Sequence, residues 1–417
     1  MFDDNLLLVT SKCPYNCFDH DGGAMFTSQL VRQLPYLVSS LDVLFIRNRE
    51  SQLENLPNIR NVDFIETHSC CESRFKSRLF HIRDINCYLE KYSDRYSLIL
   101  IQHLSNAFGI ESCSAKTRDK VVVFPMFTYL AYARSQENVN SEYIKREFVA
   151  IQAIKGFVCP SRSEANDLIQ HYGVNSRQIA CVPRGIDQNI FIPIKRVFNT
   201  NNKLELLYIG TIKPQKNQLE ALNVLEELQK LGVHSKLHLV GFIGDQQYYY
   251  KLQNEIYRRH ICSDVIYHIN VTPSEVARIT GSCHIAISVS RWETFGRGIF
   301  EGLYTGLPTI AYEDIDCIWE YLSDSEGAVS VPRSSKAMAV QIAKIFRSPE
   351  TYYYMAKEAV NSVKYLDEKS SINELYLQSK RLLFSSNNNI SMITTDGTFV
   401  YDGSNSRDST MLWRAHN

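Results

Sequence analysis

The chain has 417 residues, of which 44% are hydrophobic and 22% are charged, and these proportions are typical of a folded globular protein. Lysine plus arginine equals aspartate plus glutamate, at 45 residues each, which argues against nucleic acid as a partner because such binding needs a basic surplus. The length exceeds what one ordinary hydrophobic core contains, so we expect two α/β domains with a cleft between them.

The first half of the chain alternates apolar runs with amphipathic stretches. The apolar runs are nearly continuous, as expected for strands that helices cover on both faces of a parallel sheet. We predict strands at residues 5–11, 43–48, 97–102, 120–125, 156–160 and 179–182, and helices at 23–37 and 142–154. Alternation of this kind indicates a doubly wound sheet.

The same alternation begins again after a polar, basic segment at 191–203, which we interpret as a linker. Strands are predicted at 204–210, 236–241, 265–269, 283–290 and 308–312, and helices at 217–231, 246–260 and from Pro273 onward. The prediction is therefore one Rossmann-like domain over 1–195 and a second over 203–370. A closing helix is predicted at 371–385, and the polar, turn-rich residues 386–417 are predicted to be disordered.

Two observations favour the cytoplasm. The first residues lack the pattern of a secretory signal, and no stretch approaches the roughly 18 apolar residues that span a bilayer. The chain has 11 cysteines, and several of them, among them Cys159, Cys181 and Cys283, stand in apolar, strand-like contexts. Without a signal peptide, buried reduced thiols are the expectation.

The most informative segment is 288–308, which reads as a buried strand, a polar loop and a helix that begins with glycines. A helix start offers unpaired N–H groups and a positive dipole end, and glycine lets a phosphate come close. Glu293 and Glu301 bracket this point. A carboxylate repels phosphate but accepts two hydrogen bonds from a vicinal diol such as a ribose or hexose. The combination suits a sugar nucleotide, and the alternative is a capped surface helix with two solvated glutamates.

This segment resembles the hallmark of the retaining glycosyltransferases of family 4, also called glycosyl transferases group 1, which have a GT-B fold. That hallmark is two glutamates separated by seven residues in a Glu-x-Phe-Gly…Glu-(Ala/Gly)…Gly-x-Pro pattern. The matching residues here are Glu293, Phe295, Gly296, Glu301, Gly306 and Pro308. Segments 158–164, 182–191 and 206–217 also resemble the family in order and spacing. The resemblance covers about residues 5–370 and implies two Rossmann-like domains with parallel sheets facing across a cleft, the acceptor side first and the donor side second.

The resemblance also implies roles for individual residues. Glu301 is expected to hold the nucleotide ribose, Glu293 to lie beside the transferred sugar, and Lys216 to contact the donor diphosphate. The expected donor-binding backbone positions are Gly22, Gly23, Gly210, Thr294, Phe295, Gly296 and Arg297. Because the family has no well-attested covalent nucleophile, catalysis is expected to rest on positioning and leaving-group stabilisation.

Three positions depart from the family pattern or fit it ambiguously. Thr211 stands where the family often has an arginine, and Lys213 and Arg297 are candidates to supply the missing charge. The family has a functional histidine after the strand that matches 97–102, and the register allows Gln102 or His103 for it here; we assign it to His103, the alternative being a structural histidine. A second family histidine is absent, and 125–127 (Pro-Met-Phe) stands in its place, which predicts a distinct acceptor pocket.

No metal or cofactor is predicted beside the donor. Cys13, Cys17 and His20, and the pair at 70–71, lack a second ligand pair at zinc spacing. The acidic residues at 314 and 316 come after the donor helix, in the wrong place to bridge a metal to a diphosphate. We therefore expect activity without a divalent ion.

The predicted function is transfer of a hexose-type sugar, with retention, from a nucleoside-diphosphate sugar to a sugar, glycolipid or glycan acceptor, in the polysaccharide or glycoconjugate assembly common in the family. Two alternatives stay open: an inactive sugar-nucleotide-binding or partner-binding protein, and another GT-B enzyme such as a sugar-nucleotide epimerase. A dehydrogenase is disfavoured because the first strand lacks a following Gly-x-Gly-x-x-Gly.

Contact with a membrane is a further open point. The stretch 71–92 interleaves basic residues with apolar ones, namely Arg74, Lys76, Arg78 and Arg83 with Phe75, Leu79, Phe80 and Ile82. Such a helix either touches the inner face of a membrane or is a partly solvated helix of the first domain.

Overall fold

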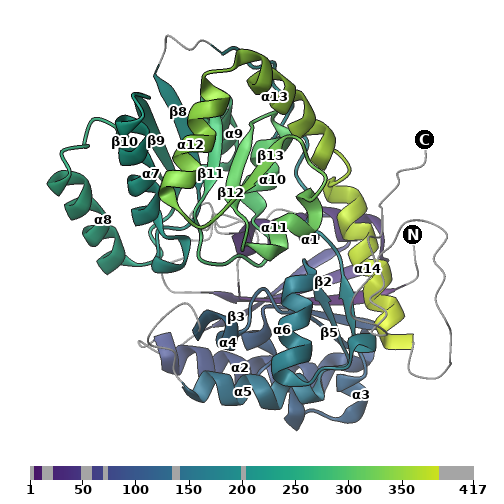
Figure 1. The fold of residues 1–417 in the computed structure, drawn as a ribbon. Helices are drawn as coiled ribbons and strands as arrows, with labels where there is room; N and C mark the ends of the chain where they lie inside the picture. Colours follow the sequence, from purple (N-terminus) through teal and green to yellow (C-terminus); the bar gives the residue numbers. More distant parts are fainter. Residues whose placement is uncertain are drawn as a thin grey trace.

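The computed structural model describes residues 4–11, 22–47, 59–68, 74–133, 141–198 and 203–384. Two parallel β-sheets, each covered by helices on both faces, form two domains that lie one above the other in Figure 1. The two Rossmann-like domains predicted from the sequence are thus confirmed. The first is called the N-domain below and the second the C-domain.

The N-domain sheet has seven strands in the order β3-β2-β1-β4-β5-β6-β7. The strands are β1 (Asn5–Thr10), β2 (Ser40–Arg47), β3 (Val62–His68), β4 (Leu98–Gln102), β5 (Val121–Phe124), β6 (Gly156–Cys159) and β7 (Ile179–Cys181). The helices between them are α1 (Gly22–Gln33), α2 (Arg74–Tyr92), α3 (Ala115–Arg118), α4 (Tyr129–Ala133), α5 (Ser141–Ala153) and α6 (Arg162–Tyr172). Every strand pair is parallel.

The C-domain sheet has six strands in the order β10-β9-β8-β11-β12-β13. The strands are β8 (Leu204–Ile209), β9 (Ser235–Gly241), β10 (Val265–Ile269), β11 (Ile285–Ser288), β12 (Thr309–Tyr312) and β13 (Ala328–Val331). The helices are α7 (Gln218–Lys230), α8 (Gln246–Arg258), α9 (Pro273–Ser282), α10 (Arg297–Tyr304), α11 (Asp316–Leu322), α12 (Ser335–Phe346) and α13 (Pro349–Val363). Its strand pairs are also all parallel.

The strands predicted from apolar runs are all present, with ends that differ by up to three residues. Strands β3 and β13 were not predicted. Both lie at a sheet edge, where part of each strand faces solvent, and Asp63 and Ser330 are exposed there. These two strands therefore lack the continuous apolar run on which the prediction depends, whereas the other two edge strands, β7 and β10, were predicted.

The core of the N-domain lies on both faces of its sheet. Phe26 and Leu30 of α1 pack on one face, and Ile85 of α2, Ile151 of α5 and Leu168 of α6 pack on the other. In the C-domain, α7, α8 and α12 contribute to one large cluster, while α9 covers a smaller one on the sheet. Both sheets are thus sandwiched, so only their strand ends and connecting loops are left to face the other domain.

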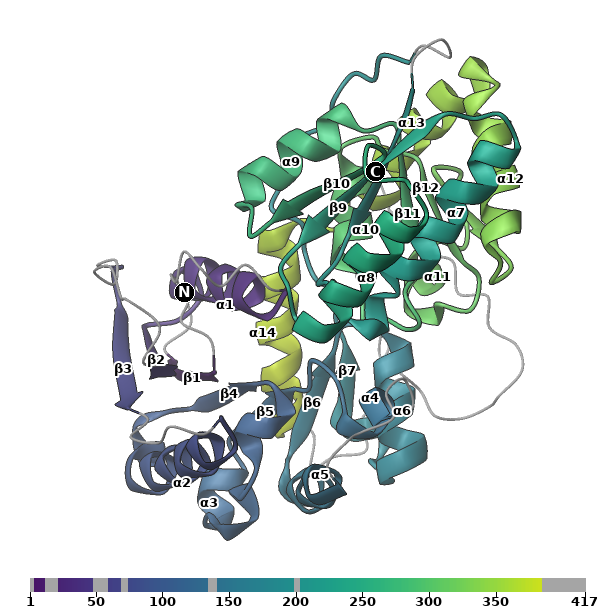
Figure 2. The same cartoon turned by 90° about the vertical axis from the view of Figure 1, so that its left-hand side faces the viewer.

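The last helix, α14 (Glu368–Phe384), returns from the C-domain to the N-domain. Its residues Ile372 and Tyr376 belong to the same core cluster as Phe26, and Lys380 forms an ion pair of 2.6 Å with Asp4. Figure 2 shows this helix beside both domains. It begins three residues before the predicted closing helix, and residues 386–417 lie outside the described ranges.

Two segments of the chain, one at Ile186 and one at 366–368, connect the domains and run side by side. The Ile186 N–H donates to the Leu366 carbonyl at 2.7 Å, and the Glu368 N–H donates to the Ile186 carbonyl at 3.1 Å. The segment interpreted as a linker then packs onto the C-domain. Arg196 is buried there and donates to the carbonyls of Thr280 and Cys283 at 2.9 and 3.0 Å. Arg196, one of the basic residues on which the linker was predicted, therefore fastens this segment to the C-domain through buried hydrogen bonds.

The domains also touch directly through α11 and α6. The Glu320 carboxylate of the C-domain accepts hydrogen bonds from the Arg162 and Ser163 amides at 2.6 and 2.7 Å, so it caps the N-terminus of α6. Tyr321 donates to the Pro160 carbonyl at 2.7 Å. These contacts hold the two strand-end surfaces facing each other.

No helix in the described part of the chain is both long and apolar enough to cross a bilayer. Cys159 and Cys283 are buried free thiols and Cys181 is a partly buried one, as predicted. The cysteines at 13, 17, 70 and 71 lie outside the described residues. In α2, Ile82 is buried and Arg83 exposed, while the side chains before residue 81 lie outside the description.

Candidate active site

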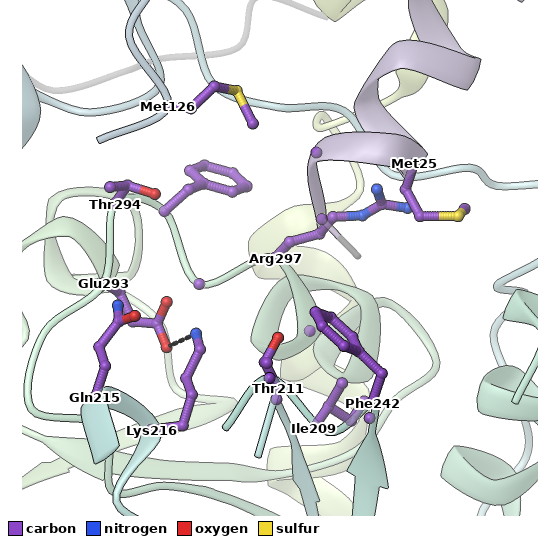
Figure 3. Close-up of a pocket in the computed structure, with 18 of the residues that line it drawn as sticks. Met25, Met126, Ile209, Thr211, Gln215, Lys216, Phe242, Glu293, Thr294 and Arg297 are labelled. Atoms are coloured by element: carbon purple, nitrogen blue, oxygen red, sulfur yellow. Dashed lines mark hydrogen bonds and ion pairs between the residues drawn. The ribbon is translucent and has the colours of Figure 1, made fainter. Parts of the chain in front are cut away.

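A cleft of about 750 Å³ lies between the two domains. Its lining comes from the segments that follow the strands, including Ser11 after β1, His103 after β4, Gly210 after β8 and Asn270 after β10. Ligands of parallel α/β sheets bind beyond the carboxyl ends of the strands, and here two such edges face each other. Figure 3 shows part of this lining, with Met25 and Met126 of the N-domain opposite the C-domain residues.

The structure brings every predicted site residue to this cleft. The N-domain contributes Gly22, Gly23 and His103, and the C-domain contributes Gly210, Lys216, Glu293, Thr294, Phe295, Gly296, Arg297 and Glu301. The residues predicted from different parts of the sequence thus form one continuous surface.

Lys216 and Glu293 form an ion pair in the floor of the cleft (Figure 3). Their Nζ and Oε1 atoms are 2.5 Å apart, and the Ser290 hydroxyl donates to the same oxygen at 2.7 Å. Lys216 ends the short 3₁₀ helix η6 (Pro214–Lys216), whose last carbonyl accepts a hydrogen bond from Tyr208. Both charged side chains are mostly buried, so each holds the other in place beside the cleft.

Arg297 and Glu301 form a second pair one helical turn apart on α10. Arg297 Nε lies 2.5 Å from Glu301 Oε1. Burial raises the pKa of the Glu301 carboxyl, and the Arg297 guanidinium opposes that rise. The Arg297 Nη1 atom is buried and has no hydrogen-bond partner in the described part of the chain. A buried donor of this kind is available to a ligand.

Two glycines allow α10 to begin at the cleft. Gly296 precedes the helix with φ of 83°, a left-handed conformation that suits glycine, and it caps the helix without a side chain. A Cβ on Gly298 would lie 2.9 Å from the Ile209 Cβ, so a glycine is needed where the helix crosses β8. The first amides of α10 therefore lie close to the cleft without a capping side chain over them.

The two candidates for the family histidine have different surroundings. His103, with φ of 76°, is half-buried, and its Nδ1 lies 2.8 Å from the Ser105 hydroxyl. Gln102 is buried, accepts from Thr10 and Thr27 at 2.9 and 2.5 Å, and donates to the Gly23 carbonyl at 2.8 Å. Gln102 therefore fixes the start of α1, while His103 is the residue of the two that presents a partly exposed ring.

Aromatic rings occupy the place of the absent second histidine. Phe127 lies 4.7 Å from His103 and 5.8 Å from Tyr132, measured between ring centroids. Tyr132 meets Trp292 of the C-domain edge-on at 6.3 Å, and Lys213 Nζ lies 5.7 Å from the Tyr132 ring. This cluster was not predicted from the sequence, although three aromatic residues within 127–132 were a visible signal.

A buried glutamate holds the aromatic segment. Both carboxylate oxygens of Glu147 accept from the Tyr129 amide at 2.9 Å, and Tyr172 donates to the same carboxylate. Burial raises the pKa of Glu147 to about 7, against these hydrogen bonds. Glu147 thus fixes the first residue of α4, and it had no signal in the sequence.

Thr211 faces the cleft with an uncharged side chain (Figure 3). Of the two candidates to replace the family arginine, Lys213 lies toward Tyr132, and Arg297 extends toward α1 and Met25. Asp314 is paired with Arg333 at 2.6 Å and is not part of the lining. Within the described residues there is no group of His, Cys, Asp and Glu suited to a metal.

Comparisons with known proteins agree with this geometry. The family model for "Glycosyl transferases group 1" matches residues 192–362, and the model for "Glycosyltransferase Family 4" matches 21–189. A curated relative, the GDP-Man:Man(3)GlcNAc(2)-PP-Dol alpha-1,2-mannosyltransferase of Caenorhabditis elegans, is 25% identical over 172 residues. That match covers 38% of this chain and 37% of the relative, so the chain spans little more than a third of that protein.

Solved structures share the fold over nearly the whole chain. Sucrose-phosphate synthase from Thermosynechococcus elongatus aligns with a TM-score of 0.76 at 14% identity, covering 92% of this chain and 100% of the other. WaaG, a glycosyltransferase involved in lipopolysaccharide biosynthesis, aligns at 0.71 and 12% identity, covering 91% and 100%. HepE of Anabaena in complex with UDP and glucose aligns at 0.69 and 14%, covering 90% and 99%. The chain belongs to the group 1 glycosyltransferases with the GT-B fold.

Proposed function

We propose that this group 1 glycosyltransferase transfers a hexose-type sugar, with retention of configuration, from a nucleoside-diphosphate sugar to a hydroxyl of a sugar, glycolipid or glycan acceptor. One observation carries the proposal. The pairs Lys216–Glu293 and Arg297–Glu301 flank the N-terminus of α10, directly across the cleft from the start of α1. This places cations for a diphosphate next to carboxylates for hydroxyl groups.

In the proposed complex, the nucleotide ribose binds at Glu301. Its carboxylate is buried, so it has lost water and gains from two hydroxyl donors of a diol. The diphosphate then lies between the first amides of α10 and Gly22 and Gly23 of α1. Glycine at those positions and a helix N-terminus on each side suit phosphate oxygens.

The sugar to be transferred then lies beside Glu293, and Lys216 faces the diphosphate that leaves. The bond from the sugar C1 to the phosphate oxygen breaks, and the acceptor oxygen bonds to C1 on the same face. The leaving phosphate takes the acceptor proton, which gives retention without a covalent enzyme intermediate. Lys216 offsets the charge that develops on the leaving group, and this is the largest contribution we assign to one side chain.

The relatives support this donor class and differ in the base. HepE was solved with UDP and glucose, and the Caenorhabditis elegans relative is named for GDP-mannose. The proposal therefore covers both nucleotide series. The same relative is named for a dolichol-linked glycan acceptor, which supports a glycolipid or glycan as the acceptor here and a role in polysaccharide or glycoconjugate assembly.

A thermal-shift screen with UDP, GDP, ADP and their sugar conjugates tests the proposal. A ligand at about a hundred times its dissociation constant adds about 2.7 kcal/mol to the free energy of unfolding, so the melting temperature rises by several degrees. We expect one nucleotide series to stabilise the wild type and not Glu301→Ala, and slow hydrolysis of the matching sugar conjugate. Absence of any shift and of hydrolysis would favour an inactive partner-binding protein instead.

We further propose that transfer needs no divalent ion and takes place in the cytoplasm. Asp314, the first of the two acidic residues at 314 and 316, is already paired with Arg333. Donor hydrolysis should persist in a chelator, and its complete loss would refute this part. Membrane contact through α2 is tested separately by flotation with anionic vesicles, where a lack of binding would leave α2 as a partly solvated helix.

A further inference from the structure

Arg184 is a buried cation in the wall of the cleft that the proposed mechanism does not use. It follows β7, in the segment where the chain leaves the N-domain, and it is 8% exposed. Its guanidinium lies 4.8 Å from the centroid of the Phe26 ring, and Nη2 lies 3.0 Å from the Met126 sulfur. Neither neighbour carries a charge, and among the described residues Arg184 has no ion-pair partner.

The carboxylate with the strongest influence on Arg184 does not neutralise it. Glu164, in the first turn of α6, is 4% exposed, and its side-chain hydrogen-bonding neighbour is the buried thiol of Cys159 rather than a cation. Burial raises the pKa of Glu164 to about 8, so this carboxyl is mostly uncharged at neutral pH. Burial lowers the pKa of Arg184 only to about 10, which leaves the guanidinium charged.

A second arginine approaches from the other domain. Arg297 of α10 extends toward α1 (Figure 3), and its Nη1 atom is buried without a partner in the described residues. Both arginines line the cleft and approach α1, Arg184 through the ring of Phe26 and Arg297 from the other side. The positive charge of Arg297 also contributes to the lowering of the Arg184 pKa. Burying a cation without its counter-charge is costly, and an anion between the two would relieve both desolvation and repulsion.

The nature of that anion follows from the geometry of the donors. A guanidinium offers N–H groups in a fixed plane that matches the oxygens of a phosphate. The first turn of α1 carries no acidic residue, and its N-terminus adds a favourable dipole. Thr211, where the family resemblance leads one to expect an arginine, adds no charge. The cleft therefore has two guanidinium groups, one from each domain. Arg184 has no ion-pair partner among the described residues, and Arg297 pairs with Glu301 through Nε while its Nη1 has no hydrogen-bond partner there.

We propose that Arg184 and Arg297 together bind a phosphate group of a substrate across the cleft, and that this pair replaces the charge that Thr211 lacks. The phosphate is assigned to the donor diphosphate, and this assignment rests on the proposed function. A phosphorylated acceptor would offer the same chemistry. In either case the bound phosphate joins the two domains, since each arginine belongs to a different one.

The test measures binding of inorganic pyrophosphate, inorganic phosphate and the stabilising nucleoside diphosphate by calorimetry, with Arg184→Gln and Arg297→Gln. We expect each variant to weaken pyrophosphate and the nucleoside diphosphate about 10- to 100-fold, the scale of one charged hydrogen-bonded contact. Binding of the parent nucleoside should not change. If Arg184→Gln weakens only inorganic phosphate, the site serves a phosphorylated acceptor. If it weakens none of the three, the proposal is overturned.

Two further variants separate binding from folding. Arg177→Gln removes the same charge from an exposed position of the N-domain and should leave all affinities unchanged. Arg184→Lys keeps the charge without the planar fork and should retain part of the affinity. Without ligand, the melting temperature of Arg184→Gln should be no lower than that of the wild type, because the substitution removes a cation that has no ion-pair partner. A clear fall in melting temperature with unchanged phosphate affinity would indicate that Arg184 is a structural residue, and it would overturn the proposal. Absence of any sugar-nucleotide hydrolysis with intact pyrophosphate binding would instead count against the transferase function alone.

Discussion

The two walls of the cleft are built in different ways. In the C-domain wall, the charged residues that we assign to the donor form two direct ion pairs, Lys216–Glu293 and Arg297–Glu301. In the N-domain wall, the arrangement depends on hydrogen bonds that join several helices and strands. Gln102 joins Thr10, Thr27 and Gly23, and Glu147 joins α4 to α6.

This difference indicates how each wall can vary. A wall whose charged residues hold each other in pairs keeps its chemistry as long as both partners of each pair are kept, which fits a donor site with one task. A wall assembled from several loops can change one loop at a time while the sheet stays the same. The aromatic residues Phe127 and Tyr132 are such a change, and they lie on the side that we assign to the acceptor, where Tyr132 meets Trp292 of the C-domain.

The largest effect is expected from Lys216→Met in the C-domain wall. Removing the cation that faces the leaving group should lower kcat for donor hydrolysis about 100- to 1,000-fold, more than it lowers nucleotide affinity. Lys230→Met, which removes an exposed lysine of α7, is the matched control. Because the variant also leaves Glu293 without its partner, Lys216→Met with Glu293→Gln should be measured too. Equal losses of affinity and of kcat would mean that Lys216 only binds.

A somewhat smaller effect is expected from Glu301→Gln. The amide accepts fewer hydrogen bonds from a diol than the carboxylate and no longer pairs with Arg297, so nucleoside-diphosphate affinity should fall about 10- to 100-fold. Calorimetry with the ribonucleotide and its 2′-deoxy analogue checks the reason: the wild type should prefer the ribonucleotide and the variant should not. Glu227→Gln on α7 serves as control. An unchanged preference in Glu301→Gln would place the ribose elsewhere.

On the N-domain wall, His103→Ala should separate turnover from donor binding. We expect donor hydrolysis to slow by about 10-fold, the scale of one neutral hydrogen bond, while nucleoside-diphosphate affinity stays the same. His171→Ala, on α6 away from the cleft, is the control. Full turnover in His103→Ala would make His103 a structural residue and would shift the N-domain contribution to the aromatic cluster.

What could be predicted from the sequence depended on how local each signal is. Glu293 and Glu301 were predicted because their motif is local, Lys216 because the segment 206–217 resembles the family, and the two domains because parallel strands are continuously apolar. The position of the family histidine was ambiguous between Gln102 and His103, because a shift of one residue decides which of the two side chains is buried. Arg184 was missed because its significance depends on Arg297, more than a hundred residues away. The edge strands β3 and β13 were missed because half-solvated strands lack the apolar pattern.

The smallest effect concerns the support of the N-domain wall, and it depends on pH. The pKa of Glu147 in the folded protein, about 7, lies above the value near 4.3 of a free glutamate. The folded state therefore holds more protons than the unfolded state between these values, so this residue makes the protein less stable as pH rises from about 4.3 to 7.

Glu147→Gln removes this titration and keeps the shape of the side chain. Thermal unfolding from pH 5 to 8 should show the wild type losing melting temperature relative to the variant as pH rises. Each pKa unit corresponds to about 1.4 kcal/mol, and each kcal/mol moves the melting temperature of a domain of this size by about 2–4 °C. The melting temperature of the wild type should therefore fall by several degrees relative to that of the variant between pH 5 and pH 8. Glu164, whose pKa is raised to about 8, titrates in both proteins and cancels in the difference. If the melting temperatures of the two proteins changed in parallel, Glu147 would be ionised at every pH in this range. The aromatic segment of α4 would then be held by a permanent carboxylate charge, and charge would hold the N-domain wall as it holds the C-domain wall.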